Sequence, residues 1–395
     1  IFLENSKYEE AVATIQHLLK HFPNDPNNPE LHYSMITAYN AMRRYKEAFE
    51  ERAHLAKAYG AGTEWHRVNK DKQEVISAAD KLMQKALSDL ASYHHSEAQR
   101  LKGQLASGGA TTQEVMNEYG LAAEAYEKYL AHFPSSSNVY DLSFRYAECL
   151  YWSTNFARAA LQFASVRDSK LGKKHIESAA HFSIASHQDA IELLINGGKL
   201  AARPSLVSEL QPEPVRPDGQ KAEQEEEEEN DGLVKKIEPE PIPDEVLLLL
   251  GSLKKYVELD LSNSEDKSRR PNHIYKLGEV YFDYKHYDKS RKWMAILIKK
   301  YPKQKATRYA AERIIETYQV ANDWKQMAEW AEKIDAAGLG REFDEKIRTM
   351  RVGALFQGAT RLQSAGKLKE AATEYVRLVD TNPGNKYAAQ ALNNA

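Results

Sequence analysis

The chain has 395 residues, of which 42% are hydrophobic, and its formal net charge at pH 7 is −3. This balance does not favour nucleic-acid binding, and no run approaches the ~20 apolar residues that cross a bilayer. The one cysteine, Cys149, excludes an intramolecular disulfide and fits both the cytosol and a bacterial envelope protein stabilised by packing.

A pattern of small and apolar residues recurs along the chain. In most copies a small residue is followed by apolar residues four and seven positions later, and in four copies by a proline twelve positions later. The copies begin at Ala11, Ala48, Ala122, Ala159, Ser290, Met327 and Ala371, and several neighbours are 37 residues apart. A repeat of this length indicates helix pairs stacked as a solenoid, an architecture that usually binds rather than catalyses.

The same register predicts two antiparallel helices in each copy. The small residue lies on the second helix, and the first helix carries three seam residues thirteen, twelve and nine positions earlier. For the copy at Ser290 these are Leu277, Gly278 and Tyr281. Small residues let the helices approach closely, and large residues fill the seam at helical spacing. A proline such as Pro302 ends the second helix, because it cannot donate the next hydrogen bond.

Two parts of the chain depart from the repeat. Residues 62–115 predict a long helix with a break at 107–109, without a clear repeat motif. The spacing between Met327 and Ala371 is 44 residues, which predicts an insertion near 338–340.

Residues 203–243 differ in composition from the rest of the chain. They hold seven of the 14 prolines and the glutamate run 225–229, and residues 205–245 contain 14 acidic and 4 basic side chains. Such a segment cannot bury enough apolar surface to offset its ordering entropy, so we predict disorder and little change in thermal stability when 205–243 is deleted. Its flanks, 173–195 and 244–261, are predicted helices. The segment is either an acidic loop within one repeat or a linker between two solenoid halves. The predicted domains are residues 1–202, 203–243 and 244–395.

Candidate chemical sites are few. His17 and His21 have a metal-compatible spacing on a helix, but no third ligand is evident, so we expect exposed helix-face histidines. Cys149 lies beside seam residues and is expected to be a buried, unreactive thiol. The sequence has no glycine-rich phosphate loop and no Gly-x-Ser-x-Gly motif. We therefore expect no catalytic, cofactor-binding or metal-binding residues, and no enzymatic activity.

These repeats resemble the tetratricopeptide repeat family, over about three quarters of the chain. The resemblance implies an all-α, right-handed superhelical solenoid, here interrupted by the acidic insert. It also implies a concave groove that binds partners. The residues at the groove positions are Tyr33, Phe144, Glu148, Tyr151, Tyr275, Glu279, Phe282, Glu316 and Phe356.

The groove prediction has two parts. Aromatic side chains on rigid helices are suitable anchors for a bound peptide or helix, although they can instead stack on one another. The carboxylates Glu148, Glu279 and Glu316 would repel a terminal carboxylate, so we expect the groove to prefer a basic or apolar segment.

The helix ends add a second resemblance. Phe22-Pro23, Phe133-Pro134 and Tyr301-Pro302 follow second helices, as in bacterial envelope repeat proteins. Residues 57–71 are similar to repeat proteins of the adventurous gliding-motility machinery of deltaproteobacteria. This implies a scaffold in a trans-envelope complex, in the periplasm or at the outer membrane, with protein partners and no cofactor.

Alternatives to the motility scaffold remain. They are an outer-membrane or peptidoglycan assembly adaptor, the helical part of a larger envelope enzyme, and a cytoplasmic location. Because Ile1 is not methionine and the end at Ala395 resembles an opening repeat, we expect a piece of a longer protein without its targeting signals.

Overall fold

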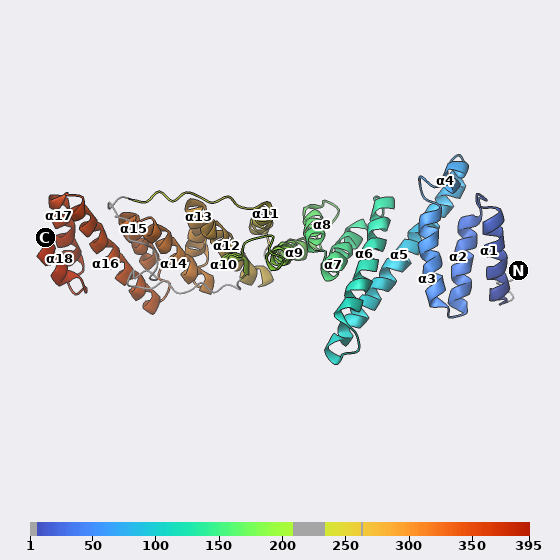
Figure 1. Cartoon of the computed structure of the whole chain (residues 1–395), viewed down its shortest axis with the longest axis horizontal. Helices are drawn as coiled ribbons and strands as arrows, with labels where there is room; N and C mark the ends of the chain where they lie inside the picture. The colour runs from blue at the N-terminus through green and yellow to red at the C-terminus, as the bar shows by residue number, and fades with distance from the viewer. Residues whose placement is uncertain (1–5, 208–233, 262–263) are drawn as a thin grey trace. The chain divides into compact units, whose positions relative to one another are not determined.

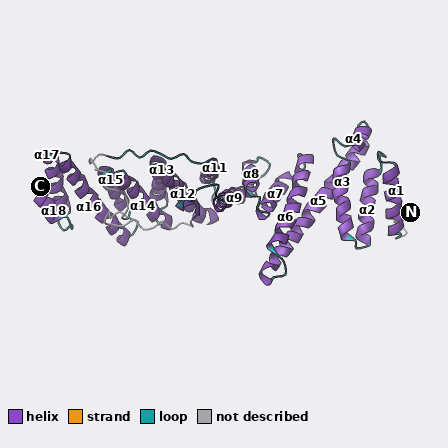
Figure 2. Ribbon diagram, in the orientation of Figure 1, coloured by secondary structure: helices purple, strands orange, loops and turns teal. Residues whose placement is uncertain are grey.

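The computed structural model describes residues 6–207, 234–261 and 264–395, and within these ranges its regular secondary structure is helical, without strands (Figures 1 and 2). The all-α prediction is therefore confirmed. The chain divides into two compact units, Ile1–Ser186 and His187–Ala395, called here the N-terminal and C-terminal units. Their boundary lies within helix α9 (Ile176–Asn196), upstream of the predicted insert.

Helices of the N-terminal unit pack against their neighbours along the chain, from α1 on α2 to α7 on α8, with α3 packed directly on α5. The helices are α1 (Tyr8–His21), α2 (Asn28–Ala41), α3 (Tyr45–Ala58), α4 (Glu64–Asn69), α5 (Gln73–Gln104), α6 (Thr112–His132), α7 (Val139–Trp152) and α8 (Phe156–Asp168).

Helix α5 is the long helix that the sequence predicted within 62–115, and it packs against α6 as a hairpin. The chain leaves α5 through a short 3₁₀ turn and a left-handed Gly108 with a φ of 72°. Helix α6 then begins at a capping box, in which the Thr111 hydroxyl accepts from the Glu114 N–H and the Glu114 carboxylate accepts from the Thr111 N–H. These reciprocal bonds satisfy two of the free N–H groups at the helix start and fix the turn.

In the C-terminal unit, each helix from α11 to α18 packs on the next, and α10 packs on α12. The helices are α10 (Pro204–Val207), α11 (Asp244–Glu258), α12 (Ser264–Asp283), α13 (Tyr287–Lys300), α14 (Lys305–Val320), α15 (Trp324–Ala336), α16 (Arg341–Ser364), α17 (Leu368–Thr381) and α18 (Ala388–Asn394). The extra residues between Met327 and Ala371 lengthen α16, which has 24 residues and begins directly after the loop at 338–340.

The predicted small positions lie in the seams between paired helices. Ala48, Ala122, Ala159 and Ser290 are all fully buried. At Gly278 on α12, a Cβ atom would lie 2.7 Å from the Cγ of Met294 on α13. A side chain at this position would therefore push the two helices apart, and glycine allows the close approach.

The turns between paired helices repeat one backbone geometry. Five of them place one residue in the left-handed region, always five positions before the small residue of the repeat: Arg43, Thr154, Lys285, Asn322 and Gly366, with φ values from 54° to 74°. In the first, the Arg44 N–H donates to the Tyr39 carbonyl and the Arg43 N–H to the Asn40 carbonyl. The other four turns have the same two bonds. This is the Schellman motif, which ends a helix and reverses the chain.

The acidic insert differs from the prediction at its described ends. Residues 208–233, including the glutamate run, lie outside the described residues. Residues 204–207 form α10, and residues 234–243, called here the strap, are extended and lead into α11 (Figure 1). The strap hydrogen-bonds to the C-terminal unit at Ala321 and Tyr284, so these ends of the insert are ordered, and deletion of 205–243 would remove specific contacts.

Candidate protein-binding surfaces

Three of the aromatic residues predicted for the groove are core residues. Tyr275, Phe356 and Phe144 are only 1%, 6% and 8% exposed. The Phe144 ring stacks on His175 with centroids 4.2 Å apart, and the Phe356 ring stacks on Tyr387 at 4.7 Å. The structure therefore corrects the expectation that these side chains are presented to a partner, because each of them is buried within its own unit.

Two more predicted aromatics are half-buried in the N-terminal unit. The Lys85 ammonium lies 5.4 Å from the centre of the Tyr33 ring, and Tyr151 packs against Phe156 at 5.3 Å. Both contacts are within the unit, which favours the alternative that groove aromatics stack on their neighbours.

The predicted acidic residues of the C-terminal unit are ion-paired. Arg313 on α14 donates from Nε to Glu279 on α12 at 2.9 Å and from a terminal nitrogen to Glu316 at 2.6 Å. The guanidinium also lies 4.7 Å from the centre of the Phe282 ring. Burial raises the pKa of Glu279, and Arg313 opposes this shift. The premise of free groove carboxylates therefore does not hold for Glu279 and Glu316.

Glu148 on α7 has a different setting. Burial raises its pKa, while Arg145 and Lys102 act in the opposite direction. The Lys102 ammonium lies 2.9 Å from the centre of the Trp152 ring, a cation–π contact between α5 and α7. Glu148 thus lies among cations of its own unit.

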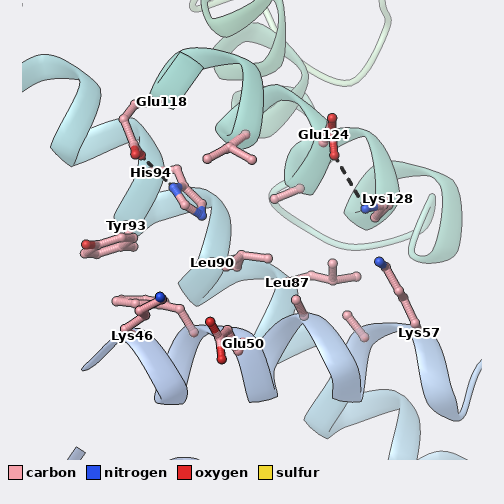
Figure 3. A pocket seen from close by; sticks show the side chains of 15 residues that line it. Lys46, Glu50, Lys57, Leu87, Leu90, Tyr93, His94, Glu118, Glu124 and Lys128 are labelled. Atoms are coloured by element: carbon pink, nitrogen blue, oxygen red, sulfur yellow. Dashed lines mark hydrogen bonds and ion pairs between the residues drawn. The ribbon is translucent and has the colours of Figure 1, made fainter. Parts of the chain in front are cut away.

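A groove that the sequence did not predict lies between α3, α5 and α6 in the N-terminal unit, with a volume of about 590 Å³ (Figure 3). Its floor is apolar: Ala56, Leu87 and Ala125 are buried, and Leu90 is half-buried. Leu121 on α6 lines the groove with 43% of its surface exposed. The groove therefore offers apolar surface that no other helix of the unit covers.

Aromatic and charged side chains line the part of the groove beside Leu90 (Figure 3). The Phe49 and Tyr93 rings stack with centroids 3.6 Å apart, which joins α3 to α5. Next to them, His94 Nδ1 lies 2.7 Å from the Glu118 carboxylate, which joins α5 to α6 (Figure 3). These contacts hold all three helices of the groove together.

The rim carries both signs of charge. Lys46, Glu50 and Lys57 on α3 are exposed, and on α6 Lys128 lies 3.9 Å from Glu124 (Figure 3). An apolar floor with a polar, mixed-charge rim is typical of protein-binding sites. The repeat pattern did not predict this groove, because α5 lies in the part of the chain without a clear repeat motif.

Other sequence predictions concern single residues. His17 and His21 are exposed and stack on each other at 4.1 Å, and no group of three His, Cys, Asp or Glu residues suited to a metal occurs in the described part of the chain. Cys149 is fully buried, which confirms the predicted burial, and this burial raises the pKa of its thiol. No described helix is both long and apolar enough to cross a membrane.

A comparison with models of known families and with curated protein sequences finds no match to this chain.

Proposed function

We propose that this chain is a non-enzymatic scaffold of the tetratricopeptide-repeat type, which holds other proteins in a bacterial cell-envelope complex. Support for the scaffold role comes from the consecutive packing of helix pairs and from their repeated turn geometry. Such stacks expose long helix faces, and their usual role is to bind other proteins. The right-handed superhelix, the envelope location and a role in gliding motility follow from the sequence resemblance.

The groove between α3, α5 and α6 is the observation that carries this proposal. An isolated exposed leucine is ordinary, but Leu121 adjoins the apolar floor of a groove of about 590 Å³ that has charged rims. A partner that places an apolar side chain on Leu90 and Leu121 would bury this floor. The lysines on the rim would then lie within reach of acidic groups of the partner.

The test is a crosslinking experiment in the native organism with the full chain. Lys46, Lys57 and Lys128 provide amines at the groove rim. We expect crosslinks from these lysines to a defined partner, and we expect Leu121→Asp to abolish them. The matched control is Leu161→Asp, because Leu161 on α8 is 58% exposed and does not line the groove. Identical crosslinks in the wild type and both variants would refute the groove as the binding site.

A further inference from the structure

The strap binds two equivalent points of the C-terminal unit. The Lys235 N–H donates to the Ala321 carbonyl and the Glu240 N–H to the Tyr284 carbonyl, both at 2.9 Å. Tyr284 and Ala321 each stand directly before the left-handed residue of a Schellman turn, 37 residues apart. The two bonds within each turn use earlier carbonyls, so these helix-end carbonyls can accept from another segment. The two backbone hydrogen bonds of the strap therefore go to equivalent positions of successive helix pairs.

Glu240 is the most strongly bound residue of the strap. Its carboxylate accepts from Arg203 at 2.6 Å and from Lys285 at 2.8 Å, and its carbonyl oxygen lies 2.9 Å from His286 Nε2. Lys285, and after it Arg203, holds the pKa of the Glu240 carboxyl group below its usual value. The Glu240 N–H also donates to the Tyr284 carbonyl. The C-terminal unit therefore binds both the backbone and the charged side chain of Glu240.

The strap sequence favours its bound conformation before it docks. Pro239, Pro241 and Pro243 have fixed φ angles, and each restricts the residue before it to extended backbone. At ~3.1 Å per residue, the five steps along the chain from Lys235 to Glu240 span about 16 Å as polyproline II. An extended segment of this kind loses little conformational entropy on binding.

The attachment is nevertheless limited. Most strap residues are exposed, and only Ile237, Glu240, Ile242 and Pro243 are half-buried. A segment with few buried contacts opens locally at a low free-energy cost. The strap can therefore exchange with a competing segment of similar chemistry.

We propose that the turn edge formed by Arg203, Tyr284, Lys285, His286 and Ala321 is a binding site for extended, proline-rich acidic segments of other proteins. The strap occupies this edge as a displaceable ligand within the chain. The preferred partner segment has a glutamate directly flanked by prolines, as Glu240 is flanked by Pro239 and Pro241. This surface is separate from the groove of the N-terminal unit, so either proposal can fail without the other.

The test measures binding of a fluorescent synthetic peptide with the sequence of residues 234–243 to the full-length chain by anisotropy. Glu240→Ala removes the ion pairs of the strap, and we expect faster hydrogen exchange at the Lys235 and Glu240 positions together with at least tenfold tighter peptide binding than in the wild type. The tethered strap competes with the peptide in the wild type and lowers its apparent affinity.

A charge exchange supplies the control. Lys285 is about half exposed, so Lys285→Glu in the Glu240→Ala background is expected to leave the fold intact and to weaken peptide binding at least tenfold. A peptide with lysine at the Glu240 position should bind this double variant better than the original peptide does. The proposal is overturned if Glu240→Ala leaves strap exchange unchanged, if the released edge does not bind the peptide, or if Lys285→Glu has no effect on affinity.

Discussion

Replacement of Arg313 by methionine tests the ion-pair cluster at the centre of the C-terminal unit. The Arg313 and Glu279 side chains are 12% and 8% exposed, so neither can be hydrated in place. Methionine keeps much of the side-chain volume but leaves the Glu279 carboxylate buried without its cation. Loss of one partner of a buried pair costs about 3–5 kcal/mol. For a unit of about 200 residues, this corresponds to a fall in Tm of roughly 6–20 °C.

The stability that the Arg313→Met variant loses should depend on pH. Burial raises the folded-state pKa of Glu279, and Arg313 opposes this, so Arg313→Met raises the pKa further. A carboxyl group whose folded pKa exceeds its unfolded value stabilises the fold at low pH and loses this contribution as the pH rises through the folded pKa. The difference between variant and wild type should therefore be larger at pH 8 than at pH 5.

Thermal unfolding by circular dichroism, with hydrogen exchange to locate the change in α12 and α14, measures this effect. Glu279→Gln in the Arg313→Met background should recover more than half of the lost stability, because an uncharged amide replaces the buried charge. Arg351→Met is the matched control: Arg351 pairs with Glu332 at 3.1 Å in a more exposed pair, worth less than about 1 kcal/mol. An Arg313→Met protein that melts within about 2 °C of the wild type, or no lower than the Arg351→Met control, would refute the reasoning.

Three further predictions concern backbone and core. Thr154 is β-branched in a left-handed turn, so Thr154→Gly should raise the free energy of unfolding by about 0.5–1 kcal/mol in urea titration, whereas Asn322→Gly should change it little, since asparagine tolerates this conformation. Gly278→Ala should lower the free energy of unfolding by about 1–2 kcal/mol, because the added methyl overpacks the helix seam. Gly251→Ala, on open helix surface, should raise the free energy of unfolding by about 0.5–1 kcal/mol. Equal effects of the two substitutions would contradict the seam argument. Cys149 should react with a thiol reagent only on unfolding, so rapid labelling of the native chain would show that this helix seam is open.

The sequence predicted the features that depend on residues close together in the chain. The helix pairs, their small seam residues and the long helix before the 107–109 break follow from helical periodicity and from glycine and proline positions. The helices on both sides of the acidic insert were also identified, because their apolar patterns are local.

The exposure of the predicted groove residues was not visible in the sequence. Position within a repeat placed Tyr275 and Glu279 on one helix, α12, but the first helix of the next pair, α14, supplies Arg313, which lies 34 residues from Glu279. Whether an aromatic or acidic side chain faces solvent depends on that neighbour, and the repeat pattern does not specify it.

Local composition and periodicity determined that this chain forms paired helices, because a helix and its hairpin partner are set by interactions within about forty residues. Only the tertiary structure decided which surfaces stay open. The groove depends on how α3 and α6 lie across α5, and the strap depends on helix-end carbonyls that become regularly spaced once the pairs have packed. The left-handed backbone at Arg43, Thr154 and Lys285 could not be predicted from these residue types, because the packing of each helix pair imposes that turn.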